Sequence, residues 1–406
     1  MSSLRTLFLS LAVFAGLASG ATGSGLTALA RVDSAASALR DDGGAVVVDL
    51  ALSQPVPWRA YTLDAPRRLV VDFSDVQWDG PVQSDSVQTG AVTTGPVAPG
   101  WSRMVVELGA PLAIRQAALD TSAPDGRARL LIRLDPVDAA AFAATSGVPA
   151  DFALALPRPV VPAVPPKPEG RLRVVLDPGH GGIDPGAEYD GMTEAALMLT
   201  FARELREALL RAGFDVLMTR EADVFVPLEA RVTFGREADA DVFLSLHADS
   251  LPEGAGSAHG ATVYVLSEDA SDEASQRLAE KHDGADLMAG VDLSGQGDEI
   301  ALVLMDMARV ETEPRTQRLA QILIDEITEE AGRMNRQPLR SANFSVLRSP
   351  AIPSVLIELG FLSSRADRAR LADPEWRGKA AAGIRDALVA WSVEERARAS
   401  LLRTRP

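Results

Sequence analysis

Residues 174–182, VVLDPGHGG, run from an apolar stretch into a turn rich in glycine and proline. The apolar half predicts a buried strand, and the glycines allow the backbone to bend sharply around His180. A histidine just beyond the carboxyl end of a buried strand lies where open α/β sheets place their ligands. This stretch therefore predicts an α/β fold with a functional site at one edge of its sheet.

Two further stretches repeat this pattern of an apolar strand that ends in a polar residue. Residues 242–249, VFLSLHAD, contain His247, and residues 355–361, VLIELGF, contain Glu358. The remaining elements expected in this half of the chain are strands at 172–176 and 262–266 and helices at 194–211, 229–236, 315–330 and 377–391. Apolar strands that alternate with amphipathic helices indicate a mixed, mostly parallel sheet with helices on both faces.

Glu194 begins the first of these helices and falls on the same side as the apolar residues Leu197 and Phe201. A carboxylate that faces a core needs a cation or several hydrogen-bond donors. The alternative is an ordinary first-turn glutamate that the helix dipole favours, with Thr193 as the N-cap.

His180, Glu194 and His247 together supply the donor set of a three-ligand zinc site with a fourth position open for water. Glu358 would then serve as the acid/base beside that water. The alternatives are a hydrogen-bonded core role for each histidine and an ion pair of Glu358 with an arginine such as Arg340. The spacing predicts a metal hydrolase and leaves the substrate open.

Residues 31–137 carry a different pattern. Strand-like apolar runs, separated by clusters of Gly, Pro, Asp and Ser, occur at 45–50, 68–73, 103–108 and 128–134. No long helical period appears between them, so this part predicts a small all-β sandwich ahead of the α/β domain. The proline-rich residues 150–170 predict an extended linker to a catalytic domain at 171–391.

Composition and chain ends restrict where the protein works. Residues 1–21 combine an early arginine, an apolar run and small residues, which is the pattern of a secretory signal peptide, and residues 392–406 predict a polar tail. No other run is long and apolar enough to span a membrane. The net charge of −16 argues against nucleic-acid binding, and the absence of cysteine excludes disulfides and thiolate ligands. We expect an exported, periplasmic protein without a membrane span in its mature form.

Residues 171–391 resemble the zinc-dependent N-acetylmuramoyl-L-alanine amidases of bacterial cell division. The motifs that carry the resemblance are LDPGHGGIDPGA at 176–187, MTREAD at 218–223, DVFLSLHADS at 241–250 and NFSVLRSPAIPSVLIELGFLSS at 343–364. The resemblance implies that His180, Glu194 and His247 bind Zn²⁺ and that Glu358 is the catalytic residue. It also implies hydrolysis of the amide between N-acetylmuramic acid and L-alanine in peptidoglycan, for wall remodelling and daughter-cell separation.

The β-rich part resembles the AMIN domain through residues 64–73, DAPRRLVVDF. This resemblance implies binding to peptidoglycan and targeting to the division site, and the alternative is a purely structural sandwich. One departure from the amidases is Asp249, which stands where many relatives have asparagine.

An acidic insertion at residues 267–313 follows a predicted strand and contains helix signals. Division amidases of this type carry an insertion here whose helix blocks the zinc until a LytM-type activator pulls it away. By this resemblance Glu280 is predicted to occupy the open zinc position, whereas His282 is interpreted as non-catalytic. The alternative is a solvated acidic segment without a regulatory role.

Two other functions compete with the amidase hypothesis. The same metal site could serve a peptidoglycan endopeptidase or carboxypeptidase, or the chain could be a non-catalytic wall-binding division adaptor. The complete set of predicted ligands with Glu358 argues against the adaptor.

Overall fold

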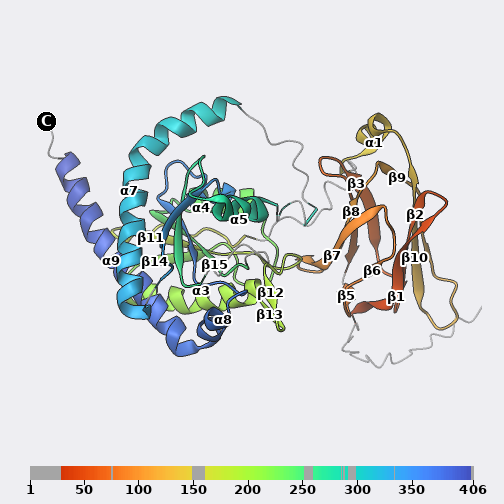
Figure 1. The fold of residues 1–406 in the computed structure, drawn as a ribbon, viewed down its shortest axis with the longest axis horizontal. Helices are drawn as coiled ribbons and strands as arrows, with labels where there is room; N and C mark the ends of the chain where they lie inside the picture. The colour runs from red at the N-terminus through yellow and green to blue at the C-terminus, as the bar shows by residue number, and fades with distance from the viewer. Residues whose placement is uncertain are drawn as a thin grey trace, which may run out of the picture.

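The computed structural model describes residues 29–74, 76–148, 161–250, 259–284, 286, 289–290, 299–332 and 334–403. A β-rich part and an α/β part lie next to each other, and α7 and α9 form the side farthest from the β-rich part (Figure 1). The predicted signal peptide at 1–21 and most of the first half of the predicted linker lie outside the described residues. No helix among the described residues is long and apolar enough to cross a membrane.

The β-rich part is a sandwich of two sheets, as the sequence predicted. One sheet has the order β5-β1-β2-β10-β9 with β6 paired to β1, and the other has the order β3-β4-β8-β7. Its elements are β1 (Ala30–Asp42), β2 (Ala45–Leu52), β3 (Trp58–Leu63), β4 (Arg68–Ser74), β5 (Val76–Trp78), β6 (Gln83–Ser84), β7 (Thr89–Ala98), β8 (Trp101–Leu108), β9 (Leu112–Asp120), β10 (Ala128–Pro136) and the short helix α1 (Ala139–Thr145). Alternate residues such as Val46, Val48 and Leu50 point inward and are fully buried.

The α/β part contains a six-stranded sheet in the order β14-β11-β15-β18-β16-β17. Its strands are β11 (Arg173–Pro178), β14 (Asp215–Met218), β15 (Val242–His247), β16 (Thr262–Leu266), β17 (Leu339–Ala342) and β18 (Ser354–Glu358). All neighbouring pairs are parallel except β16 and β18, so the sheet is mixed and mostly parallel. A separate hairpin is formed by β12 (Glu188–Tyr189) and β13 (Met192–Thr193).

Helices cover both faces of this sheet, which confirms the predicted layering. The helical elements are α3 (Glu194–Arg211), α4 (Leu228–Glu237), α5 (Glu273–Asp283), α7 (Glu299–Ala331), η1 (Ser345–Leu347), α8 (Arg365–Ala372) and α9 (Pro374–Arg403). Residues of α3, α7 and α9 share a buried cluster with one face of the strands. Residues of α4, α5 and η1 pack on the other face, around Phe243 and Leu356.

Several details of the α/β part differ from the sequence expectations. Strands β14 and β17, the β12–β13 hairpin and helix α8 were not predicted, and α7 starts at Glu299 and continues through Pro314. Helix α9 continues to Arg403, so most of the predicted polar tail is helical. The reason is that the sequence after Trp391 lacks glycine and proline until the last residue and is rich in alanine, glutamate and arginine, which are good helix formers.

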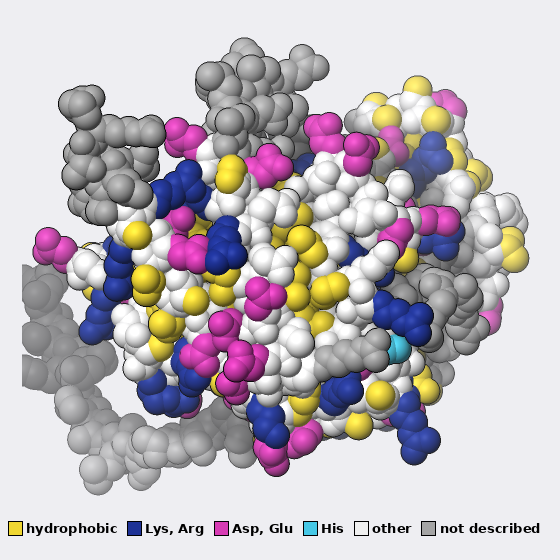
Figure 2. All heavy atoms as spheres, turned by 60° about the vertical axis from the view of Figure 1, so that its left-hand side comes forward, with side chains coloured by type: hydrophobic (Ala, Val, Ile, Leu, Met, Phe, Trp, Pro, Cys, Tyr) yellow, Lys and Arg dark blue, Asp and Glu magenta, His cyan; other side chains and the backbone are white. Residues whose placement is uncertain are grey.

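The outer face of α7 and α9 carries intermixed charge. Figure 2 shows acidic and basic side chains dispersed over the side of the molecule that these helices form. Arg315 pairs with Glu395 and Arg318 with Glu394 across the two helices. Such exposed pairs contribute about 0–1 kcal/mol each, so the buried cluster beneath them is what holds the helices together.

Candidate metal centre and its surroundings

The ends of three neighbouring parallel strands meet at one edge of the sheet. His180 lies two residues beyond β11, His247 is the last residue of β15, and Glu358 is the last residue of β18. His247 and Glu358 are direct partners in the pairing of β15 with β18. The structure therefore brings together the predicted strand-end residues, because parallel strands present their carboxyl ends on the same side.

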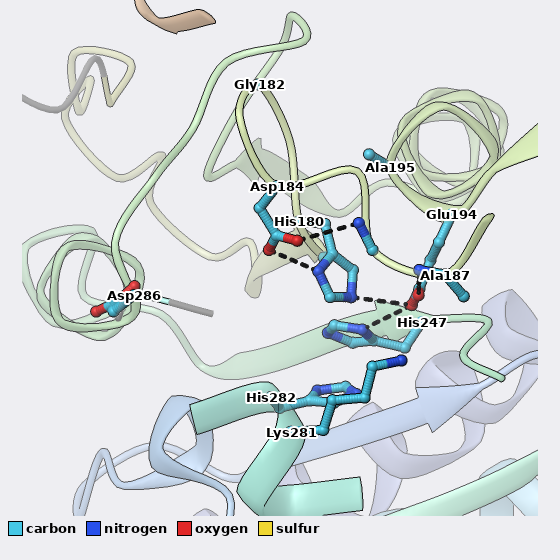
Figure 3. A network of polar contacts seen from close by, with 12 residues as sticks. His180, Gly182, Asp184, Ala187, Glu194, Ala195, His247, Lys281, His282 and Asp286 are labelled. Carbon is cyan, nitrogen blue, oxygen red and sulfur yellow. Dashed lines mark hydrogen bonds and ion pairs between the residues drawn. The ribbon is translucent and has the colours of Figure 1, made fainter. Parts of the chain in front are cut away.

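Glu194 is fully buried and its carboxylate points at both histidines (Figure 3). Its Oε1 atom lies 3.2 Å from Nε2 of His180 and 3.0 Å from Nδ1 of His247. Backbone N–H groups of Ala248 and Ala187 donate to its two oxygens. Thr193 caps α3, as expected if Glu194 were an ordinary first-turn glutamate. The carboxylate of Glu194 nevertheless faces the two histidines.

Glycines allow these side chains to approach closely. A Cβ atom on Gly179 would lie 2.2 Å from the ring of His247. A Cβ atom on Gly186 would lie 2.6 Å from the ring of His180 and 2.8 Å from Oε2 of Glu194. His180 itself has φ +58°, a conformation that costs a non-glycine residue energy and that the surrounding contacts must maintain.

The contacts that maintain His180 come from three residues that had no role assigned from the sequence. Asp184 Oδ2 lies 2.7 Å from Nδ1 of His180 and orients the ring. Arg231 donates to the carbonyl oxygens of His180 and Pro178, and its Nη1 lies 2.8 Å from Oδ1 of Asp177. The clue in the sequence was that Asp177 and Asp184 lie inside the motif at 176–187, whereas Arg231 lies on the helix that follows the motif at 218–223.

Arg220 connects the same turn to α3. Its guanidinium donates to the carbonyl oxygens of Pro178, Gly179 and Ala195, and the side chain is fully buried. Burial lowers the pKa of Arg220 to about 10, and the positive charge of Arg231 adds to that effect. Arg220 therefore links the turn that carries His180 to the start of the helix that carries Glu194, and Arg231 holds the same turn from α4.

The insertion contributes a third histidine to the site. His282, on α5, lies with its ring centroid 4.2 Å from that of His247 and 5.7 Å from that of His180. Nitrogen atoms of the three imidazoles lie within 4.8 Å of one another, which is compatible with a shared metal ion. Figure 3 shows the three rings converging, with Lys281 extended beside them.

The structure places Glu280 away from these three rings. Glu280 is exposed, and its carboxylate accepts a hydrogen bond from Gln276 on the outer side of α5. Residues two apart on a helix point in nearly opposite directions, so when His282 faces the site Glu280 faces away. His282, which the sequence analysis set aside, is the residue of α5 that contacts the site.

Ion pairs and hydrogen bonds hold α5 in this position. Lys281 pairs with Asp249, whose carboxylate is fully buried. Asp283 accepts hydrogen bonds from the backbone N–H and the hydroxyl of Ser345, each at 2.9 Å. Asp249, the residue that departs from the family pattern, is thus the partner of the insertion.

Glu358 does not form the ion pair that the simpler interpretation required. Arg340 pairs instead with Asp272 at the start of α5. The backbone N–H of Asp249 donates to Oε2 of Glu358 at 3.0 Å, and Oε1 lies 3.8 Å from Nε2 of His282. Burial, reinforced by the negative charges of Glu194 and Asp249, raises the pKa of Glu358 well above its usual value.

Two further pKa shifts describe the histidines. Burial, with the neighbouring charge of His282, lowers the pKa of His247 to about 4, which keeps this ring neutral and able to bind a metal. Burial also opposes charge on His180, but the carboxylates of Glu194 and Asp184 outweigh it and raise its pKa well above the usual value. The field that attracts a proton to His180 equally attracts a metal cation.

Four buried atoms in this site make no hydrogen bond within the described part of the chain: His180 Nε2, Asp249 Oδ2, His282 Nε2 and Glu358 Oε1. Unpaired buried polar atoms are costly, so a cluster of them marks a place for a ligand. Nitrogen and carboxylate donors are those that zinc prefers. The separations of 3.0–3.2 Å from Glu194 to the two imidazoles also approach the roughly 3.3 Å between ligand atoms in tetrahedral zinc sites.

Comparison with known proteins places this site in a family. Residues 174–390 match the N-acetylmuramoyl-L-alanine amidase family, and residues 37–134 match the AMIN domain. The chain belongs to this amidase family. The N-terminal sandwich is therefore an AMIN domain and the α/β part an amidase domain.

Two relatives found by sequence agree with this assignment. The N-acetylmuramoyl-L-alanine amidase AmiC of Neisseria meningitidis is 33% identical over 80% of this chain and 82% of its own length. The amidase AmiA of Escherichia coli is 33% identical over 55% of this chain and 76% of its own length. Among solved structures, an N-acetylmuramoyl-L-alanine amidase of Nostoc punctiforme is 26% identical, covers 55% of this chain and 97% of its own, and has a TM-score of 0.40.

Proposed function

We propose that the chain is a zinc-dependent N-acetylmuramoyl-L-alanine amidase that acts on peptidoglycan in the periplasm. The observation that carries this proposal is the convergence of buried imidazole and carboxylate groups at the meeting point of the three strand ends. Family membership supports the choice of substrate, because the relatives are named as amidases of this bond.

His180, Glu194 and His247 are the residues that would hold the zinc ion, because their donor atoms already face one another. Bound zinc would supply a water of lowered pKa and would polarise the carbonyl of the scissile amide. Arg231 and Asp184 keep the ring of His180 in place through its backbone and its Nδ1 atom. Such supporting contacts orient the ligands and raise the affinity of a metal site.

Glu358 is the proposed acid/base. The backbone N–H of Asp249 fixes its Oε2 atom and leaves Oε1 directed into the site without a hydrogen bond. Its raised pKa suits a group that accepts a proton from the attacking water and delivers it to the leaving nitrogen of L-alanine. No other carboxylate in the site combines a free oxygen with a raised pKa in this way among the described residues.

We also propose that α5 keeps the enzyme inactive in this conformation. His282 lies against the zinc ligands, in the space that a water and the substrate carbonyl would need. The autoinhibitory residue is thus His282 in place of Glu280. A LytM-type activator is the proposed partner that withdraws α5, and the AMIN domain is the proposed contact with peptidoglycan.

The test compares Glu358→Gln with Glu280→Gln as a matched control on the exposed side of α5. Both are made in the full chain and in a His282→Ala background, which leaves the site open. Glu358→Gln should retain zinc by metal analysis and lose at least about a hundredfold in hydrolysis of dye-labelled peptidoglycan, whereas Glu280→Gln should change neither.

Mass spectrometry of the products identifies the bond that is cut. An amidase yields glycan strands free of stem peptide and intact stem peptides. Products cut within the stem peptide would instead support the endopeptidase or carboxypeptidase. Hydrolysis that persists in Glu358→Gln, or that a chelator leaves unchanged, would contradict the proposed site.

A further inference from the structure

The outward face of one AMIN sheet is buried, although strand alternation alone would expose it. Along β8, Met104 and Val106 point into the sandwich core. Arg103 and Val105 point the other way, yet they are only 6% and 2% exposed. Something outside the sandwich must therefore cover this face.

The amidase domain covers it. Val105 and Val97 of the AMIN domain share a buried cluster with three residues of the amidase domain: Ile183, Phe225 and Ala289. Ile183 lies in the turn that begins with His180. Ala289 belongs to the insertion, a short distance along the chain from α5.

Arg103 forms the polar centre of this contact. Its Nε donates to Oδ1 of Asp72 on β4 at 2.6 Å, within the AMIN sheet. Its Nη1 donates to the carbonyl oxygens of Ala289 at 3.0 Å and Gly290 at 3.2 Å. The guanidinium that pairs with the buried carboxylate of Asp72 thus also donates to two backbone carbonyl oxygens of the insertion. Such charge-assisted hydrogen bonds are stronger than neutral ones.

The two domains also approach each other through backbone. A Cβ atom on Gly182 would lie 2.4 Å from the carbonyl oxygen of Pro96. A Cβ atom on Gly95 would lie 2.7 Å from Cα of Ile183. Only glycine fits at both places. The two domains therefore contact each other through backbone atoms that pack closely, and not only through side chains.

We propose that this face of the AMIN domain is a docking surface for the amidase domain and that docking holds the insertion closed over the active site. The surface is defined by Val97, Arg103 and Val105, and its partner by Ile183, Phe225 and residues 289–290. Arg103 fixes the chain only seven residues beyond His282. When the AMIN domain leaves this position, the downstream end of α5 loses its anchor and the helix is free to move.

The docking arm of the test uses the absence of cysteine from the chain. Val105→Cys places one thiol in the proposed interface, and Val87→Cys places one on a side chain that is 91% exposed. Labelling of a buried thiol requires local opening, so a maleimide should modify Val105→Cys at least about tenfold more slowly than Val87→Cys. Val97→Cys is a second interface probe should Val105→Cys fold poorly, and equal rates for interface and exposed thiols would overturn the docking.

The insertion arm adds Arg103→Lys, which keeps the charge beside Asp72 and loses the fork that reaches Ala289 and Gly290. A thiol at the buried position Ala279 on α5 reports the insertion without any need for catalysis. Arg103→Lys should accelerate labelling at both Val105→Cys and Ala279→Cys by at least about fivefold, because the opening equilibrium shifts. Arg127→Lys, on a residue whose side chain is 71% exposed, is the matched control and should accelerate neither.

The activity readout rests on the proposed function, and the labelling readout does not. Arg103→Lys should also raise basal hydrolysis of peptidoglycan by several-fold. Faster labelling at Val105→Cys with unchanged labelling at Ala279→Cys would overturn the link between docking and the insertion. Faster labelling at both positions with no hydrolysis in any variant would leave the docking established and would count against the amidase activity alone.

Discussion

The two halves of the active site are held by different kinds of contact. The turn that carries His180 is held by Arg220 and Arg231. Both side chains are buried and donate mainly to backbone carbonyl oxygens. Backbone groups cannot move without unfolding the turn, so this half is rigid. The strand that ends at His247 lies in the middle of the sheet and is equally fixed.

Helix α5 is held by side-chain contacts: Leu278 and Ala279 pack into a buried apolar cluster, and polar side chains hold its edges. Lys281 reaches Asp249 from a position where its own side chain is 48% exposed, and Asp272 pairs with Arg340 near the surface. Asp283 contacts Ser345 through two hydrogen bonds. Each of these contacts can be broken without disturbing a backbone ladder, so the proposed autoinhibition requires only that α5 leaves while the proposed metal ligands stay. Under that proposal the site has a permanent half and a removable half.

Histidine substitutions on the two halves should give the largest contrast. His247→Ala should lose the bound zinc and at least about a thousandfold in hydrolysis, because a three-ligand site does not tolerate loss of a ligand. His282→Ala should keep its zinc and hydrolyse peptidoglycan faster than the unaltered chain. Metal analysis and dye release from labelled peptidoglycan measure both.

Loss of zinc from His282→Ala would contradict this division, because His282 would then be a permanent ligand. The three imidazoles would in that case form the metal site together, as their mutual distances allow. Comparable rises in activity from both substitutions are not expected under either arrangement.

Arg231→Lys tests the rigid half without touching a ligand. Lysine keeps the charge near Asp177 but cannot donate at once to Pro178 and His180. Zinc affinity should fall about 10- to 100-fold, the range typical of residues that orient metal ligands. Competition with a chromogenic chelator measures this directly. Arg236→Lys, exposed on the same helix, should leave zinc affinity unchanged, and a similar loss in both variants would point to a general loss of stability.

Asp286 offers a pH-dependent test of the removable half. It is 4% exposed and accepts the backbone N–H of Leu228, and burial raises its pKa to about 6 from 3.8. The folded state therefore prefers the protonated carboxyl. As pH rises from about 4 to about 6 the carboxyl ionises, and the free energy of unfolding falls. Asp286→Asn keeps an acceptor and cannot ionise, so it should stabilise the protein above pH 6 by at most about 3 kcal/mol.

Urea unfolding at about pH 4 and at pH 7.5 checks this sign. The advantage of Asp286→Asn over the unaltered chain should appear at the higher pH and nearly vanish at the lower one. Glu273→Gln, which removes an exposed acid from α5, is the control and should show no such trend. If Asp286→Asn stabilised the protein more at low pH, ionisation of the Asp286 carboxyl would not be what destabilises the folded state at high pH.

The rigid half could be predicted from sequence, and the removable half could not. His180, His247 and Glu358 follow apolar strands, and the rule that parallel strands share one edge brings their ends together. Glu194 was predicted from the apolar stripe of its own helix. In each case a local pattern fixes the direction of the side chain relative to a core.

Helix α5 has no such reference. Its position depends on polar partners far away in the chain, such as Asp249 and Ser345. From the sequence, Glu280 was predicted by resemblance and His282 was interpreted as non-catalytic. The docking face of the AMIN domain was hidden for a related reason. Alternation along β8 marks Arg103 as outward-facing, which by itself predicts exposure, and only a second domain turns that face into an interface.

Of these substitutions, Lys281→Ala should change the rate of basal hydrolysis least. It tests how much the ion pair of Lys281 with Asp249 contributes to the closed position of α5. Removal of the ammonium takes one of several partners from the buried carboxylate of Asp249, which keeps the N–H of Ser250 and lies 3.3 Å from Nε2 of His282. The closed state therefore becomes less favourable. Because Lys281 is half-exposed, the loss should be no more than about 1 kcal/mol, or roughly a fivefold rise in basal hydrolysis. Arg277→Ala removes an exposed cation one turn earlier, where it pairs with Glu273, and should change the rate by less than about twofold. Equal rates in Lys281→Ala and the unaltered chain would assign the closed state to the contacts of Asp283, Arg340 and the AMIN domain instead.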